Sequence, residues 1–380
     1  MRPIVDFNHA PFIVIWEITR ACDLACRHCR AEAQPQPDHH ELTTDEGLKL
    51  LSLVREEFGP VLFVLTGGDP LKRADLHQLI RHGTAIGLRM TITPSVTPLL
   101  TCEALGALHA SGIRRVAMSL DGADAKTHDQ FRGVDGTFRR TIEALTTAHN
   151  LGIEIQINST VSRHNLEQVE QLSKMVGWLG ATLWSVFVVV PTGRAALPGP
   201  VRTDDTNHAG ASPDDDSLVP TAVEHELLYR KLANIALDPA TTYDVKTTAG
   251  QPYYRVLAQE RARRGVDSPT RSLRAPRGVN DGNGFLFISH TGDLCPSGFL
   301  PLAAGNVRTH SAATVYRHHD LFTRLRQPDT FSGKCGRCDF NHHCGGSRSR
   351  TYAMTGDPFA SDPTCVYQPS SKALTQNEPA

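Results

Sequence analysis

Apolar segments of strand type and amphipathic segments of helix type alternate through the first half of the 380-residue chain. The segment FIVIWEI (12–18) is dense in β-branched and aromatic residues, which predicts a buried strand. The segment TTDEGLKLLSLVREEF (43–58) places apolar residues at helical spacing behind a threonine that can cap a helix. Further strands are predicted over 61–69, 89–95, 114–122, 154–161 and 182–190, and further helices over 74–87, 100–111, 138–151, 165–179 and 221–236. Because short connections between such segments are typical of parallel βαβ units, the sequence predicts an α/β fold with a closed or partial (β/α)6 barrel of the TIM type.

Polar and glycine-rich stretches follow three of the predicted strands. The first strand is followed by a loop with Cys22, Cys26 and Cys29, the second by TGGDP (66–70), and the fourth ends in SLDG (119–122). In barrels of parallel strands, the loops that follow the strands form the active face. We therefore expect these three stretches to meet at one end of the barrel.

The overall composition excludes several classes of protein. The formal net charge is −1 and the sequence pI is about 7.0, so no overall positive field attracts nucleic acid. No apolar run of roughly 18 residues occurs, and the first residues, MRPIVDFNHAPFIVIW, lack the layout of a secretory signal. With nine cysteines and no export signal, we expect a protein of the reducing cytoplasm that binds metal rather than forming disulfides, with no nucleic-acid or membrane partner.

The spacing of the first three cysteines indicates an iron–sulfur cluster. Structural zinc sites are closed by four ligands and are usually built from pairs of CxxC type, whereas Cys22, Cys26 and Cys29 offer three closely spaced thiols. Three thiolates suit a cubane cluster in which three irons are held by the protein and one is free to chelate a small molecule. A zinc loop that borrows a distant fourth ligand is the alternative.

The CxxxCxxC spacing after the first strand of a βα barrel resembles the radical S-adenosylmethionine (SAM) enzyme family, and the resemblance covers about residues 10–195. His28 stands where that family usually has an aromatic residue. The resemblance implies that Cys22, Cys26 and Cys29 hold a [4Fe–4S] cluster whose free iron chelates SAM. It also implies the activity: the reduced cluster cleaves SAM to a 5′-deoxyadenosyl radical, which abstracts a hydrogen atom from a substrate.

The same resemblance assigns contacts to SAM. TGGDP resembles the family's GGEP-type turn, which meets the amino end of SAM, although here Asp replaces the usual Glu. SLDG resembles a strand end near the SAM carboxylate and ribose, and QINSTVSRHN (156–165) resembles a fifth strand whose polar residues face the cofactor. Each motif is also compatible with an ordinary turn or strand end. The residues that the resemblance places against SAM are Gly67, Gly68, Asp69, Ser119, Asp121 and Asn158.

Four more thiols gather near the end of the chain, in CGRCDFNHHC and DPTC. Cys335, Cys338, Cys344 and Cys365 could close around one zinc ion in a small ribbon. Behind a radical SAM barrel, the pattern resembles instead the SPASM extension, which carries auxiliary [4Fe–4S] clusters. The resemblance implies one complete auxiliary cluster held by these four thiols, because the further thiols that a second cluster requires are missing.

Serines and isolated cysteines occupy the remaining positions of interest. Ser297 and Ser347 stand where the SPASM pattern has cysteines, and Cys295 is out of step by two positions. We interpret Cys295 as an ordinary buried thiol, with contact to substrate or a cluster as the alternative. Cys102 is predicted to lie in the core.

The resemblance implies three parts of the chain. They are a core barrel over 10–195, a bridging region over 196–284 that begins with a linker rich in Pro, Gly and Asp, and a small cysteine-rich iron–sulfur domain over 285–370. SPASM enzymes modify ribosomal peptides, and a related branch alters tetrapyrrole side chains in heme pathways. The stretch CGGSRSRTYAMTGDPFASDPTCVYQP is closer to that branch.

We therefore expect a radical SAM oxidoreductase that acts on a tetrapyrrole or a peptide, with an electron donor such as flavodoxin or ferredoxin. Arg348, Arg350, Lys246 and Arg255 could pair with propionate carboxylates, or they could be solvated surface charges. A non-catalytic iron–sulfur electron-transfer or scaffold protein, and a zinc-binding interaction module, are the alternative functions.

Overall fold

The computed structural model describes residues 6–196, 217–266 and 278–370. Within these residues, one sheet of ten strands has the order β10-β9-β8-β1-β2-β3-β4-β5-β6-β7. The strands are β1 Ile13–Thr19, β2 Leu62–Gly67, β3 Arg89–Ile92, β4 Arg115–Ser119, β5 Glu154–Val161, β6 Leu183–Val188, β7 Asp244–Thr248, β8 Phe285–Ile288, β9 Asp293–Cys295 and β10 Gly305–Asn306. Strands β8 and β1 to β7 pair in parallel, whereas β9 and β10 add antiparallel strands beyond β8. Because the end strands β7 and β10 do not pair, the sheet is curved but not closed.

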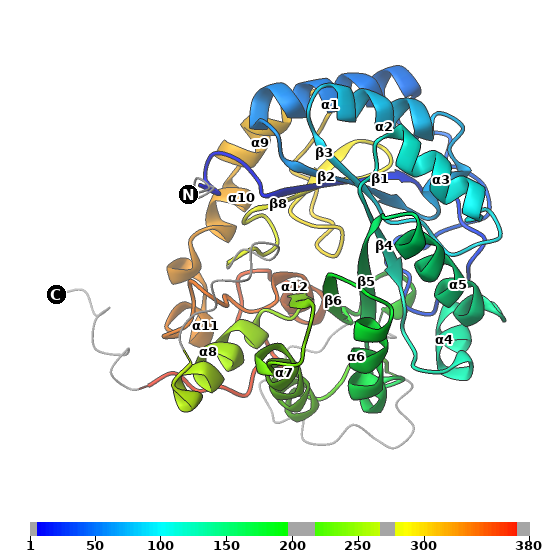
Figure 1. The fold of residues 1–380 in the computed structure, drawn as a ribbon. Coiled ribbons are helices and arrows are strands. Elements are labelled where there is room, and N and C mark those ends of the chain that lie inside the picture. Colours follow the sequence, from blue (N-terminus) through cyan, green and yellow to red (C-terminus); the bar gives the residue numbers. More distant parts are fainter. Residues whose placement is uncertain (1–5, 197–216, 267–277, 371–380) are drawn as a thin grey trace.

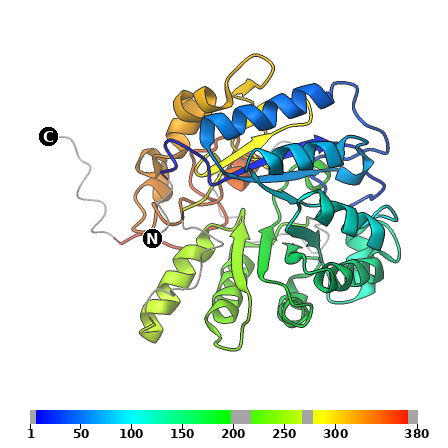
Figure 2. The same cartoon turned by 45° about the horizontal axis from the view of Figure 1, so that its top comes forward.

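Helices cover the outer face of this curved sheet (Figure 1). The α-helices of the described residues are α1 Thr44–Phe58, α2 Leu76–Ala85, α3 Cys102–Ser111, α4 Ala125–Arg132, α5 Thr137–Asn150, α6 Val169–Trp178, α7 Ala222–Leu237, α8 Pro252–Arg264, α9 Ala312–His318, α10 Asp320–Leu325, α11 Gly333–Gly336 and α12 Arg348–Thr355. The C-terminal helices α9 to α12 lie on the side between β8 and α8, where the sheet is open (Figures 1 and 2). The inner face of the sheet is thereby left for a site.

Two of the helices begin with the same capping arrangement. Thr43 accepts a hydrogen bond from the backbone N–H of Glu46, and the Glu46 carboxylate accepts one from the backbone N–H of Thr43. Thr221 and Glu224 repeat this capping box at the start of α7. Each box satisfies two backbone donors that a helix leaves unpaired at its N-terminus, which explains where these helices begin.

Two tryptophans anchor the core between the sheet and the helices. Trp16 of β1 and Trp184 of β6 are both fully buried. Helix α1 approaches the first of these rings through Gly47, where an added Cβ would lie only 2.7 Å from the ring of Trp16. The second ring donates a hydrogen bond from Nε1 to Ser159 Oγ over 3.0 Å. Strands rich in β-branched and aromatic residues are found where the sequence predicts them, because their side chains pack closely against the helices in this core.

The six predicted strands correspond to β1 to β6, which confirms the α/β fold with a partial barrel. The sequence did not predict α4, a short helix in the connection between β4 and α5. It also did not predict that β7, from the region 196–284, and β8, from the region 285–370, extend the same sheet. The division into three parts stays a prediction, and most of the predicted linker lies outside the described residues.

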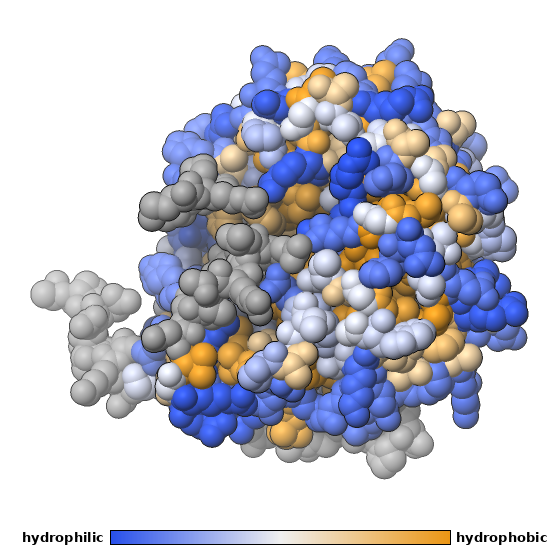
Figure 3. Space-filling model, in the orientation of Figure 1, coloured by the Kyte–Doolittle hydropathy of each residue, from blue (hydrophilic) through white to orange (hydrophobic). Residues whose placement is uncertain are grey.

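The surface has two features that bear on the sequence predictions. Cys102 is exposed at the start of α3, so the prediction that it lies in the core was wrong. None of the described helices is long and apolar enough to cross a membrane. The face seen in Figure 3 mixes polar and apolar side chains, with apolar ones visible between the polar ones.

Candidate active site

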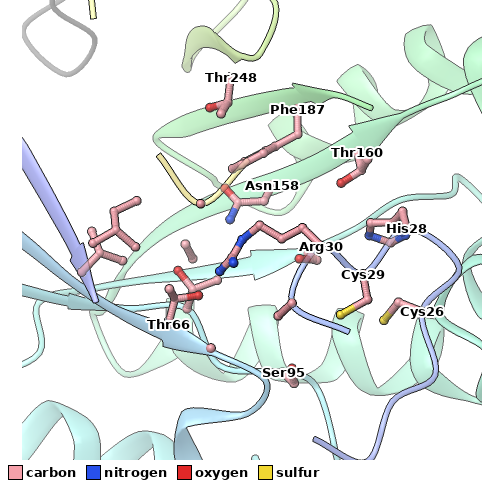
Figure 4. A pocket seen from close by; sticks show the side chains of 18 of the residues that line it. Cys26, His28, Cys29, Arg30, Thr66, Ser95, Asn158, Thr160, Phe187 and Thr248 are labelled. Atoms are coloured by element: carbon pink, nitrogen blue, oxygen red, sulfur yellow. The ribbon is translucent and has the colours of Figure 1, made fainter. Parts of the chain in front are cut away.

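A cavity of about 270 Å³ lies within the curve of the sheet. The loop after β1, with Cys22, Cys26 and Cys29, lines one part of it, and residues of the strands from β1 to β8 line the rest. Arg30 extends from the cysteine loop across the middle of the cavity, between Thr66 and Asn158 (Figure 4). The predicted meeting of the cysteine loop with other strand ends therefore occurs around one cavity.

Each thiol of the cysteine loop has a nitrogen donor directed at its sulfur. The backbone N–H of Leu24 donates to Cys22 Sγ, and that of Ala33 donates to Cys29 Sγ, both over 3.4 Å. The third sulfur, Cys26 Sγ, accepts from the guanidinium of Arg132 over 3.6 Å. Donors of this kind stabilise thiolate, which is the form that binds iron, so the chemistry of the donor set fits an iron–sulfur cluster.

Burial opposes that ionisation while the thiols are free. It raises the pKa of both Cys22 and Cys26 above the ordinary value of a thiol. Metal binding at this loop must therefore displace protons, as it does generally for cysteine ligands. In the described part of the chain, no three His, Cys, Asp or Glu side chains are grouped so that they could hold a single metal ion.

The cysteine loop is fastened from the segment after β6. Arg194 donates from Nε to the carbonyl oxygen of Cys26 over 2.8 Å, and its backbone N–H donates to the carbonyl oxygen of Cys29 over 3.0 Å. Gly193 precedes it with φ +56°, and a Cβ there would overlap the Cys29 carbonyl. The loop's conformation thus depends on a contact between residues far apart in the sequence.

Arg132, at the end of α4, is the functional residue that the sequence analysis missed. It lines the cavity, and its Nη2 lies 2.5 Å from Oδ2 of the fully buried Asp121. Burial opposes ionisation of Asp121, but Arg132, together with His28, His128 and the backbone N–H of Thr160, holds the pKa of the carboxyl below its ordinary value. The result is a buried ion pair directly beside the Cys26 sulfur. The only feature of the sequence that pointed to Arg132 was the presence of a basic residue in the connection after SLDG.

The glycine-rich turn after β2 packs directly on the chain that leads into the cysteine loop. Gly67 and Gly68 line the cavity, and a Cβ on either would overlap a backbone carbonyl of Thr19 or Ala21. Asp69 does not line the cavity. Its buried carboxylate accepts hydrogen bonds from Thr97 Oγ1 over 2.7 Å and from a backbone N–H in the following turn. The glycines are therefore required by close packing of two loops.

Of the other predicted SAM contacts, two line the cavity and one lies behind its wall. Ser119 and Asn158 line the cavity and are register partners on β4 and β5. The Asn158 Oδ1 accepts a hydrogen bond from Gln156 Nε2 over 2.7 Å. Asp121 does not line the cavity, because its side chain is turned to Arg132 and to the backbone N–H of Thr160.

His28 replaces an aromatic side chain by stacking like one. Its ring lies 4.0 Å from the ring of Phe131, with an angle of 14° between the planes. Burial lowers the pKa of His28 to about 3, so the imidazole is neutral at physiological pH. The departure from the family pattern therefore preserves a flat, uncharged ring at the wall of the cavity.

The four C-terminal thiols also meet around one cavity, which is separate from the first. Cys335, Cys338, Cys344 and Cys365 line it together with Arg255. The sulfur of Cys335 accepts from the backbone N–H of Asp362 over 3.3 Å, and that of Cys344 accepts from Gly346 N–H over 3.4 Å. These donors, like those at the first loop, fit thiolate ligands of a cluster.

Arg348 and Arg350 are fully buried, which rules out solvated surface charge for both. Arg348 donates to Cys335 Sγ over 3.6 Å and to two backbone carbonyls, while Arg350 pairs with the buried Asp362 over 3.4 Å. Both therefore support the C-terminal cysteine cavity and do not line the large one. Arg255 is also buried and pairs with Glu226, so of the four proposed propionate partners only Lys246 lines the large cavity.

Comparison with known proteins gives consistent results. The model of the Radical SAM superfamily matches residues 16–176. An AdoMet-dependent heme synthase of Oleidesulfovibrio alaskensis is 37% identical over 98% of this chain and 91% of its own length. The enzyme of the same name from Nitratidesulfovibrio vulgaris is 38% identical over 97% and 95%. At lower identity, the PqqA peptide cyclase of Bradyrhizobium diazoefficiens is 28% identical over 96% and 88%.

Among solved structures, Streptococcus suis SuiB bound to S-adenosylmethionine has a similar fold. The TM-score is 0.67 at 15% identity, and the match covers 94% of this chain and 78% of that chain. At such low identity the likeness concerns the fold alone.

Proposed function

Because this chain belongs to the radical SAM superfamily, which implies a [4Fe–4S] cluster and SAM as cofactors, we propose that it removes a hydrogen atom from a side chain of a tetrapyrrole. The observation that carries the proposal is the cavity itself. The three thiols open into the same space as several aromatic side chains and Lys246, for which the described residues supply no acidic partner, so a flat, acidic substrate can approach the cysteine loop. Identity to AdoMet-dependent heme synthases over nearly the whole chain supports a tetrapyrrole over other substrates.

In this proposal, Cys22, Cys26 and Cys29 hold the cluster. When bound, the cluster would supply the one-electron reduction of SAM that starts hydrogen-atom abstraction from the substrate. The side chains and backbone of Gly67, Gly68, Ser119 and Asn158 border the space next to the cluster and hold SAM. Asp69 and Asp121 act behind them: the first orders the turn after β2, and the second orients Arg132.

We further propose an auxiliary [4Fe–4S] cluster at Cys335, Cys338, Cys344 and Cys365. Four thiols around one small cavity, with N–H donors on two of the sulfurs, support it. With all four irons held by protein, such a cluster has no open position for substrate, so its role is electron transfer or structure. A flavodoxin or ferredoxin supplies the first electron.

A ribosomal peptide is the second candidate substrate. The relative that supports it is the peptide cyclase, which matches nearly the whole chain at lower identity. The two candidates differ in charge and shape, so a binding assay separates them.

Anaerobic reconstitution tests the proposal. The wild-type protein is expected to bind about eight irons, since two [4Fe–4S] clusters hold that number, and to form 5′-deoxyadenosine from SAM in the presence of a reductant. Iron coproporphyrin III, a tetrapyrrole with four propionates, should stimulate that formation. Iron loading without any SAM cleavage would support the electron-transfer or scaffold alternative, and bound zinc without colour would support the zinc module.

A further inference from the structure

Lys246 lies in the middle of β7, on the inner face of the sheet. Register pairs place Ser119 of β4 beside Asn158 of β5, Asn158 beside Ser185 of β6, and Ser185 beside Lys246. These four residues form one polar row across four strands, and three of them line the large cavity. The row begins with two of the residues proposed for SAM and ends at a cation.

Among the described residues, no acidic side chain pairs with Lys246. Four of the described arginines also line the cavity, and each has acceptors within the protein. Arg30 lies 2.7 Å from Glu17, and Arg115 lies 2.9 Å from Glu154. Arg132 pairs with Asp121, and Arg194 donates to two backbone carbonyl oxygens of the cysteine loop. Burial and the nearby Arg115 lower the pKa of Lys246 to about 8. A partly buried ammonium group without a counter-charge is costly, and an anionic ligand would offset that cost.

The polar groups near this position do not supply the missing charge. Ser185 Oγ is buried next to Lys246 in the sheet and has no hydrogen-bond partner. Asp281 shares with Lys246 a smaller cavity beside the large one, but its carboxylate accepts from the backbone N–H of Ser349 over 2.8 Å. Burial also raises the pKa of Asp281 above the ordinary value of an aspartic acid. The position is therefore built for an acceptor that the chain does not provide.

Aromatic side chains surround the space in front of Lys246. Phe285 of β8 and Phe299, in the loop after β9, line both the large cavity and the smaller one that Lys246 joins. Phe187 of β6 lies 6.1 Å from Phe299, ring centre to ring centre, and also lines the large cavity. Figure 4 shows Phe187 and Thr248 on the same side of the cavity, away from Cys26 and Cys29. A flat apolar body with an acidic arm fits these walls.

We propose that Lys246 is the anchor for one carboxylate of the substrate, with the flat part of the substrate against Phe285 and Phe299. The assignment rests on the proposed function, because it identifies the substrate as an acidic tetrapyrrole. By holding one acidic arm at β7, the anchor would orient the macrocycle so that another arm faces the cysteine loop. Lys246 is then a specificity residue that touches substrate but takes no part in SAM cleavage.

The test compares two probes and three variants of the reconstituted protein. The probes are iron coproporphyrin III and its tetramethyl ester, which keeps the macrocycle but has no carboxylate. Lys246→Met removes the charge, Lys246→Arg keeps it, and Lys174→Met removes an exposed lysine on α6 as the matched control. Anaerobic absorbance titration gives each Kd, and SAM cleavage without porphyrin is measured on the same samples.

Wild-type protein is expected to bind the tetra-acid at least about tenfold more tightly than the ester. Lys246→Met should weaken tetra-acid binding by about 10- to 100-fold, as expected for loss of a hydrogen bond between charged groups, while ester binding and SAM cleavage stay unchanged. Lys246→Arg should recover most of the affinity, and Lys174→Met should behave as wild type.

Two results would overturn the assignment in distinguishable ways. If Lys246→Met binds and converts the tetra-acid as wild type does, the anchor is wrong and the proposed function stands. If wild-type protein cleaves SAM but binds neither probe, the tetrapyrrole function fails, and the anchor fails with it. Should Lys246→Met not fold, equal affinity of wild type for the two probes would still refute a carboxylate anchor.

Discussion

The ion pair between Arg132 and Asp121 offers a sharp test of how the cysteine loop is supported. In Arg132→Met, the fully buried Asp121 loses its cation while the side-chain volume is roughly kept. Removing one partner of a buried pair costs about 3–5 kcal/mol, because an uncompensated charge stays behind. With an unfolding entropy of about 2.1 cal/mol/K per residue, the 380-residue chain has roughly 0.8 kcal/mol/K. The thermal midpoint should therefore fall by roughly 4–6 °C.

A double-mutant cycle separates charge from packing. Asp121→Asn keeps an acceptor for the backbone N–H of Thr160, which donates to Asp121 Oδ1 over 2.6 Å. Arg132→Met combined with Asp121→Asn should therefore recover most of the lost midpoint, since no buried charge remains. The assay is thermal unfolding followed by circular dichroism on anaerobically reconstituted protein. The ion-pair reasoning would be refuted if the thermal midpoint of Arg132→Met fell by less than about 1 °C, or if the double variant did not recover the lost midpoint.

The pH dependence of this effect has a definite sign. Arg132 depresses the pKa of Asp121, so the stabilisation from the pair is complete above the ordinary pKa of an aspartic acid and is lost as pH falls through the lowered folded value. Without Arg132, a major influence that lowers the pKa of Asp121 is lost, so burial raises that pKa relative to its value in the wild-type protein. The penalty in Arg132→Met should then shrink as the pH is lowered from 8 toward about 5.5, because the orphaned carboxyl becomes protonated. A penalty that grows on acidification would contradict this account.

Three further substitutions and one control substitution test the two cysteine cavities. Cys26→Ala should abolish formation of 5′-deoxyadenosine, because a cluster that loses one of its three protein ligands is not held in place. Cys102→Ala, which changes an exposed cysteine, should form as much 5′-deoxyadenosine as the wild type when both variants are assayed by chromatography. Cys338→Ala should lose about four irons, keep SAM cleavage that is uncoupled from product, and stop product formation; full turnover would mean that the auxiliary cluster is dispensable. Gly68→Ala places a Cβ against the Ala21 carbonyl and should lower the amount of iron bound at the first cysteine loop, measured as the iron content of the protein. An unchanged iron content would show that the two loops can move apart without loss of the cluster.

Local sequence was sufficient for much of the fold and for placing three thiols in one short loop. Strands such as β1 and β5 are dense in β-branched residues, and α1 carries its own capping box, so these elements depend on interactions within a few residues. The spacing of Cys22, Cys26 and Cys29 likewise places three thiols in one short loop whatever surrounds them.

The tertiary structure decided what depends on residues distant in the chain. Strands β7 and β8 lie in regions that the sequence analysis treated as separate from the barrel. They join the sheet by pairing with β6 and β1, and these contacts link segments that are far apart in the chain. Arg350 could be taken for a surface charge until Asp362 and the Ala249 carbonyl are brought to it in the interior. A charged side chain is buried only where the fold supplies its partners, and those partners come from other segments of the chain.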